Sequence, residues 1–142
     1  MELKEKTPHT ILNEIIEAAK ECGQVMLQAD RNNFGIKDKA GKANFVTAYD
    51  CKIQEMLQIK LAQILPEAEF LGEEEDCRIN REAEYIFVVD PIDGTTNFIK
   101  DYHMSCVSIG LIRNGKRYLG VVHNPYLDET FSAISGEGAY MN

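Results

Sequence analysis

The chain contains one apolar, β-branched run that ends directly on a carboxylate and continues into a short polar motif. Residues 86–89 are Ile-Phe-Val-Val, a composition typical of a buried strand. Asp90 follows at once, and Pro91 after it biases Asp90 toward an extended conformation. The sequence therefore predicts a buried strand whose C-terminal end carries an acidic side chain to the edge of a sheet.

The four residues 90–93, Asp-Pro-Ile-Asp, are predicted to form a β-turn, because proline suits the second position of such a turn. In an extended chain the Cα atoms of Asp90 and Asp93 would lie about 10 Å apart. A turn would bring them within about 7 Å. Both carboxylates would then lie at the lip of the sheet, where open α/β architectures tend to bind ligands.

The residues after this segment suit an anion. Gly94 lets the backbone approach a ligand closely. Residues 95–97, Thr-Thr-Asn, can begin a helix, whose first amides lack intrahelical partners and favour phosphate. For Asp-Pro-x-Asp alone, a polar turn with a helix cap would be the better interpretation. The whole run, from the buried strand to Asn97, favours a combined metal and phosphate site.

Residues 90–98, Asp-Pro-Ile-Asp-Gly-Thr-Thr-Asn-Phe, resemble the signature of the inositol monophosphatase family. Further segments match that family in the same order, namely Lys37, the Val-Thr-x-x-Asp stretch in 44–50, the Phe-x-Gly-Glu-Glu stretch in 70–75, and residues 107–111, 120–122 and 136–140. The match covers nearly all of the chain but only about the first half of a family member. The family's later W-D-x-A segment, which completes the second metal site, has no counterpart, and the chain lacks Trp.

The resemblance implies a set of metal ligands and a set of phosphate contacts. The implied metal ligands are the side chains of Glu73, Asp90 and Asp93 and the carbonyl group of Ile92. The implied phosphate-binding residues are Ile92, Asp93, Gly94 and Thr95. The cofactor would be Mg²⁺, as two or three ions, since Mg²⁺ suits carboxylate and carbonyl oxygens.

The resemblance also implies the catalytic residues Asp50, Thr95 and Glu73, with Lys37 on a flap near the phosphate. From the sequence alone Asp50 is better interpreted as a helix cap, because Thr47 and Asp50 fit a capping pattern. In the family the matching acid pairs with the threonine hydroxyl that holds the attacking water, which is sensible general-base chemistry. Four adjacent acids, residues 73–76, would ordinarily indicate a solvated loop, but Glu73 follows a predicted strand.

The function implied by the resemblance is Mg²⁺-dependent hydrolysis of inositol monophosphate or a related small sugar or polyol phosphate. Two alternatives stay open. One is a non-catalytic half-domain or subunit that binds metal and phosphate. The other is a nucleotide 3′-phosphatase or a fructose bisphosphatase of the same superfamily, although the sequence from Gly94 to Phe98 favours the inositol monophosphatase branch.

The composition excludes several classes of partner. The net charge is -8 and no basic cluster is present, which argues against nucleic acid and anionic membranes. No run approaches about 20 apolar residues, and the charged N-terminus does not resemble a signal peptide. None of the four cysteines forms a Cys-x-x-Cys pair. We therefore expect a cytoplasmic protein with reduced thiols, and a homodimer is compatible with the sequence.

The expected fold is α+β, with two N-terminal helices packed on a mostly antiparallel sheet, as in the first half of the layered αβαβα sugar-phosphatase fold. Residues 1–142 would form one metal- and phosphate-binding domain, a truncated version of a longer relative. Apolar periodicity predicts helices near 7–29 and 47–65. Strands are expected at 34–37, 44–46, 68–71, 86–89, 105–112, 117–123, 129–134 and 139–141, with Asn114-Gly115 as a hairpin turn.

Overall fold

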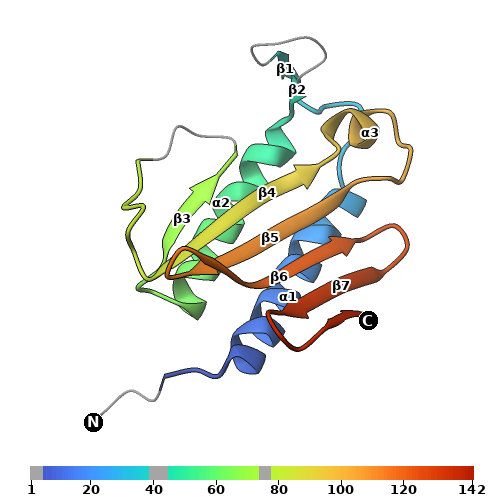
Figure 1. Ribbon diagram of the computed structural model, residues 1–142. Coiled ribbons are helices and arrows are strands. Elements are labelled where there is room, and N and C mark those ends of the chain that lie inside the picture. The colour runs from blue at the N-terminus through green and yellow to red at the C-terminus, as the bar shows by residue number, and fades with distance from the viewer. Residues whose placement is uncertain (1–4, 39–44, 74–77) are drawn as a thin grey trace.

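The computed structural model describes residues 5–38, 45–73 and 78–142. Its three helices in these ranges are α1 (Pro8–Leu27), α2 (Ala48–Ile64) and α3 (Thr95–Ile99). The strands are β1 (Lys37–Asp38), β2 (Phe45–Val46), β3 (Glu69–Gly72), β4 (Tyr85–Asp93), β5 (Cys106–Arg113), β6 (Lys116–Asn124), β7 (Glu129–Ile134) and β8 (Ala139–Met141). The long helices α1 and α2 lie behind the sheet in Figure 1, and α3 lies beyond the arrowhead of β4.

Both long helices begin where the sequence predicts, because each has a threonine cap. Thr7 Oγ1 accepts a hydrogen bond from the amide of Thr10, and Pro8 occupies the first turn of α1. Thr47 caps α2 in a capping box with Asp50. The apolar faces of both helices are buried against the sheet, which confirms the two-helix prediction.

The main sheet has six strands in the order β3-β4-β5-β6-β7-β8. The β3–β4 pair is parallel, and the other four pairs are antiparallel. Asn114 and Gly115 join β5 to β6 with φ values of 51° and 75°, as a two-residue hairpin turn requires. Strands β1 and β2 form a separate antiparallel pair. The α+β fold with a mostly antiparallel sheet is therefore confirmed.

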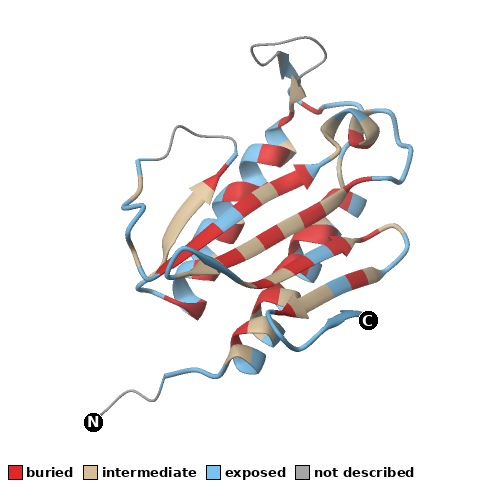
Figure 2. Cartoon of the chain, viewed as in Figure 1, coloured by how far each residue is buried: buried red, intermediate tan, exposed pale blue. Residues whose placement is uncertain are grey.

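Burial alternates along β5 and β6 and through the middle of β4, as Figure 2 shows. On β4 the side chains of Tyr85, Phe87 and Val89 are buried, whereas Val88 between them is 39% exposed. The buried set packs with α1 and α2 in the core, and the alternate set lies on the opposite face. Among the described residues, no helix that could span a membrane is present.

Two local expectations were wrong. The predicted β-turn at residues 90–93 does not form, because β4 continues through Asp93 and carries a bulge instead. The predicted strand at 34–37 is shorter and later, since β1 contains only Lys37 and Asp38. Gly35 before it has a φ of +59°, which takes the chain out of an extended conformation.

Candidate functional site

The bulge in β4 brings Asp90 and Asp93 to one face of the sheet. Asp90 pairs with Ser108 of β5, and Asp93 pairs with Cys106. Three steps along β4 thus oppose two steps along β5, so β4 carries one extra residue. Ser108 and Cys106 share a face because side chains alternate along a strand. Paired residues point to the same side, so the two carboxylates lie together although their spacing in sequence is odd.

The electrostatics around Cys106 agree with this placement. Burial raises the pKa of the Cys106 thiol to about 11, and the nearby carboxylates of Asp93 and Asp90 raise it further in the same direction. Two acidic groups therefore act on one point of the sheet face. That face is the one turned away from α1 and α2.

Glu73 follows the C-terminal end of β3, directly beside β4. The parallel register pairs Gly72 with Val89, so its continuation by one residue would place Glu73 opposite Asp90. Glu73 is exposed. Within the described ranges, no three or more His, Cys, Asp or Glu side chains are grouped so that they could hold a metal ion. The backbone thus aligns the predicted acids, but the three carboxylates do not converge as they stand.

Asp50 lies at the start of α2, where it is completely buried and accepts three hydrogen bonds. Its Oδ2 accepts from the Thr47 amide at 2.8 Å and from Thr47 Oγ1 at 2.5 Å. Its Oδ1 accepts from Thr95 Oγ1 at 2.9 Å. The two interpretations of Asp50 therefore coexist, because one oxygen caps α2 while the other reaches Thr95.

Thr95 opens α3, and its hydroxyl lies between two acceptors. Besides Asp50, the carbonyl oxygen of Ile92 lies 3.1 Å from Thr95 Oγ1. A hydroxyl has a single proton, so it donates to one of these oxygens at a time. Thr95 Oγ1 keeps lone pairs that could accept a hydrogen bond from water. This places a proton acceptor one step behind a hydroxyl, as general-base chemistry requires.

Gly94 joins the bulged end of β4 to α3 in a backbone conformation that requires glycine. Its φ is +90°, and a Cβ atom at this position would lie 2.9 Å from the carbonyl oxygen of Met104. Asn97 of α3 donates to that same carbonyl at 2.9 Å. The short helix is therefore tied closely to the loop that follows it.

Lys37, the predicted flap residue, is exposed on β1, where it pairs with Val46. It makes no ion pair with any residue that the structure describes. Residues 39–44 of the predicted flap and residues 74–77 of the acidic loop lie outside the described ranges.

Sequence reasoning missed two contributors to this end of the sheet. Gln54 of α2 is buried, and a Cβ on Gly72 would lie 2.5 Å from its Oε1, so Gly72 leaves room for that amide. Arg31 donates to the carbonyl oxygens of Phe98 and Ile99 at the end of α3. The glycine before Glu73 was a visible signal for the first contact. The sequence carries no signal for the second, because it joins residues 67 and 68 positions apart.

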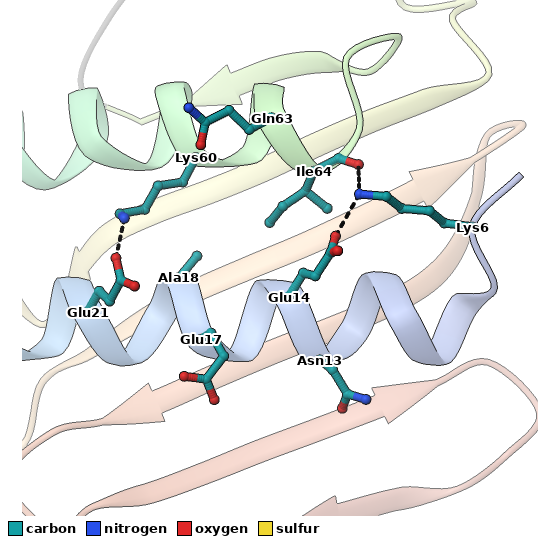
Figure 3. Close-up of a pocket in the computed structure, with 9 residues that line it drawn as sticks. All are labelled: Lys6, Asn13, Glu14, Glu17, Ala18, Glu21, Lys60, Gln63 and Ile64. Atoms are coloured by element: carbon teal, nitrogen blue, oxygen red, sulfur yellow. Dashed lines mark hydrogen bonds and ion pairs between the residues drawn. The ribbon is translucent and has the colours of Figure 1, made fainter. Parts of the chain in front are cut away.

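A separate groove between α1 and α2 contains none of the predicted site residues. Lys6 pairs with Glu14 at 2.8 Å and donates to the Ile64 carbonyl oxygen, and Lys60 pairs with Glu21 (Figure 3). Each of the two lysines of this groove is therefore paired with a glutamate, and Glu17 is the third acid of its lining. Neither lysine is left for an anionic ligand, whereas the C-terminal end of β4 carries the predicted site residues and is the candidate site.

The sequence profile described as the inositol monophosphatase family matches residues 7–142. Inositol monophosphatase 2 of Solanum lycopersicum is 38% identical over 131 residues, which cover 89% of this chain and 49% of the relative. The chain thus spans about half the length of the curated relatives it matches.

Two solved structures are also similar. The extragenic suppressor protein suhB from Bartonella henselae matches with a TM-score of 0.87 and 34% identity, over 93% of this chain and 52% of that one. An IMPase/NADP phosphatase complexed with Mg²⁺ and phosphate matches with a TM-score of 0.86 and 31% identity, over 96% of this chain and 52% of that one. With the signature on the bulged end of β4 and the Asp50–Thr95 contact in place, this chain belongs to the inositol monophosphatase family.

Proposed function

We propose that residues 1–142 form the metal- and phosphate-binding domain of a Mg²⁺-dependent phosphatase that hydrolyses inositol monophosphate or a related small sugar phosphate. The observation that supports this most is the pair of carboxylates, Asp90 and Asp93, on one sheet face beside the Asp50–Thr95 hydrogen bond. Related structures support the ligand class, since one was solved with Mg²⁺ and phosphate.

The donors of this site fit Mg²⁺, because they are hard oxygens from carboxylates and a carbonyl group. Asp90, Asp93 and the carbonyl of Ile92 would hold it, and Glu73 would turn inward to join them. When bound, Mg²⁺ would lower the pKa of a water and stabilise charge on the phosphoryl group.

The chain's own residues would move the proton and hold the phosphate. Thr95 Oγ1 would accept a hydrogen bond from the attacking water while donating its own proton to Asp50 Oδ1. Thr47 keeps the other oxygen of Asp50 occupied, so the carboxylate presents one free direction to Thr95. The amides of Gly94 and Thr95 would contact the phosphate oxygens.

A second function is favoured by one observation, that Glu73, Asp90 and Asp93 do not converge as they stand among the described residues. The chain would then bind metal and phosphate without turnover, as a subunit or interaction partner. The carboxylates would then serve for binding alone.

Phosphate release from inositol monophosphate, measured with and without Mg²⁺, separates the two functions. The phosphatase proposal expects release that requires Mg²⁺ and is lost in Asp93→Asn. Glu67→Gln, an exposed position at the other end of the sheet, is the matched control and should keep the wild-type rate. Calorimetric binding of Mg²⁺ to the wild-type chain, lost in Asp93→Asn, without any phosphate release would support the binding function instead.

A further inference from the structure

Arg31 joins the loop after α1 to the far end of α3. One of its terminal nitrogens lies 2.5 Å from the carbonyl oxygen of Phe98 and 3.1 Å from that of Ile99. Its other terminal nitrogen lies 3.6 Å from Asp101. The last carbonyls of a helix need donors from outside its regular hydrogen-bond pattern. The Phe98 carbonyl also accepts from the Asp101 amide at 3.2 Å, so Arg31 is a second donor there and a donor to Ile99. Arg31 thus caps α3 from outside the helix.

The same guanidinium group lies over two rings of the core. Its central carbon is 4.9 Å from the ring centroid of Phe34 and 5.6 Å from that of Phe98. Both rings are buried, and they contact each other with centroids 5.1 Å apart. Stacking on aromatic rings fixes the plane of the guanidinium group, so its hydrogen bonds to α3 have a defined direction.

The helix that Arg31 caps is too short to hold its own shape. It contains five residues, and isolated helices below about 12 residues are marginal in water. Its first residue is Thr95, whose hydroxyl reaches Asp50, and its last is Ile99, whose carbonyl reaches Arg31. The helix is therefore fixed at one end by a buried carboxylate and at the other by a stacked arginine.

We propose that Arg31 is a positioning residue, which holds the C-terminal end of α3 so that Thr95 Oγ1 stays within hydrogen-bonding distance of Asp50. The catalytic consequence rests on the proposed function. The structural consequence does not, because the order of α3 can be measured in a chain that has no turnover. Removing the guanidinium group should loosen α3 selectively, while the sheet keeps its stability.

The test is amide hydrogen exchange by NMR on the full chain, comparing Arg31→Met with Arg113→Met. Arg113 is a matched control, because it also lies over two aromatic rings, Tyr85 and Tyr118, and is similarly exposed, at 37% against 34%. The reporters are the amides of Phe98 and Lys100, which donate to the Gly94 and Thr96 carbonyls.

In Arg31→Met the protection of the two reporter amides should fall about tenfold or more, the size expected for losing charge-assisted hydrogen bonds. It should fall much less in Arg113→Met. The Thr95 amide resonance should shift only in the Arg31 variant. In a chain that releases phosphate, kcat should fall about tenfold while KM changes little, because a misplaced group slows the chemical step.

Equal protection of α3 in the two variants would overturn the proposal. So would loosened α3 amides with an unchanged kcat in an active chain. Arg31→Lys replaces Arg31→Met in the test if the methionine variant does not fold. Lysine can donate to a carbonyl group, but it has no planar guanidinium group to stack on the rings or to donate to two carbonyls at once. Intermediate protection in Arg31→Lys would support the proposal, and wild-type protection would contradict it. Absence of turnover in the wild-type chain would contradict the proposed function, and the exchange measurement alone would then decide whether Arg31 positions α3.

Discussion

The two ends of β4 carry similar groups in different arrangements. At the C-terminal end, Arg31 stacks on two buried phenylalanine rings and donates to backbone carbonyls of α3. At the N-terminal end, Arg113 lies over the rings of Tyr85 and Tyr118 and pairs with Glu5 and Glu84 at 3.3 and 3.4 Å. An arginine on aromatic rings thus occurs twice, but its hydrogen bonds have different acceptors.

Because of this difference we interpret the C-terminal end of β4 as a candidate site and the N-terminal end as a surface cluster of charges. Carboxylates such as Glu5, 71% exposed, would be hydrated without Arg113, so their pairing adds little to stability. At the C-terminal end Arg31 instead holds two backbone carbonyls of α3, one of which also accepts from the Asp101 amide at 3.2 Å, so this arginine fixes the position of a helix and not of mobile side chains. Asp50 differs from Glu5 in the same way, because it is completely buried and its two oxygens accept three hydrogen bonds from the protein. The largest functional effects are therefore expected at the C-terminal end of β4.

The largest effect is expected from Asp90→Asn. Under the proposed function this carboxylate would help to hold Mg²⁺, so its loss should lower Mg²⁺-dependent phosphate release about a hundredfold, as several kcal/mol of charge stabilisation are removed. Glu84→Gln at the opposite end of the strand should leave the rate unchanged. Rates of phosphate release from both variants, at saturating Mg²⁺, make the measurement. Equal losses in the two variants would show that the ends do not differ in function.

The next effect concerns the joint between β4 and α3. Gly94→Ala should lower the free energy of unfolding by about 2–4 kcal/mol, because its positive φ and the Met104 carbonyl at 2.9 Å both oppose a side chain. Gly115→Ala is the control, since its φ is also positive but a Cβ there meets nothing within 4 Å. It should cost about 1–2 kcal/mol. Urea denaturation of both variants compares them, and equal losses would show that the close approach of Met104 has no cost.

A smaller effect is expected from Asp50→Asn. Weakening the capping box of α2 should lower the free energy of unfolding by about 1–2 kcal/mol. At the N-terminal end of β4, Glu5→Gln removes an exposed ion pair and should change the free energy of unfolding by less than about 1 kcal/mol. Thermal unfolding followed by circular dichroism at two salt concentrations would measure both. A larger loss in Glu5→Gln would reverse the ranking of the two ends.

The smallest effect is a pH dependence at the N-terminal end. Burial, and then the hydrogen bond to Glu5, raise the pKa of Tyr85 to about 12. The unfolded chain loses this proton near pH 10, so the folded state binds more protons between about pH 10 and 12. The contribution of Tyr85 to the free energy of unfolding is therefore fully present below pH 10 and declines as the pH rises from about 10 to 12. Tyr85→Phe should show a shallower decline in urea denaturation, and an unchanged slope would contradict the assignment.

Much of the fold follows from local signals in the sequence. The apolar periodicity and the caps at Thr7 and Thr47 predict α1 and α2 because capping and burial act within one turn. Asn114-Gly115 predicts the β5–β6 hairpin since both residues accept a positive φ. These elements depend on neighbours in sequence, so one sequence suffices to place them.

The candidate site was only partly predictable, because its shape depends on distant segments. The bulge after Asp90 is set by how β4 pairs with β5, and a proline after an aspartate more often indicates a turn. The motif still identified Asp90, Asp93 and Thr95 as neighbours, since a turn and a bulge both shorten the distance between the acids. The contact from Arg31 to α3 could not be predicted, because nothing near Arg31 in the sequence marks it.

Paramagnetic relaxation by Mn²⁺, which takes oxygen ligands as Mg²⁺ does, tests the central claim most directly. Added to the labelled chain, Mn²⁺ should first broaden the amides of Glu73, Asp90 and residues 92–95, and excess Mg²⁺ should restore them. The broadening should be lost in Asp93→Asn. Broadening that instead centres on the acidic side chains of α1, such as Glu17, with residues 90–95 unaffected, would contradict a metal site at the end of β4.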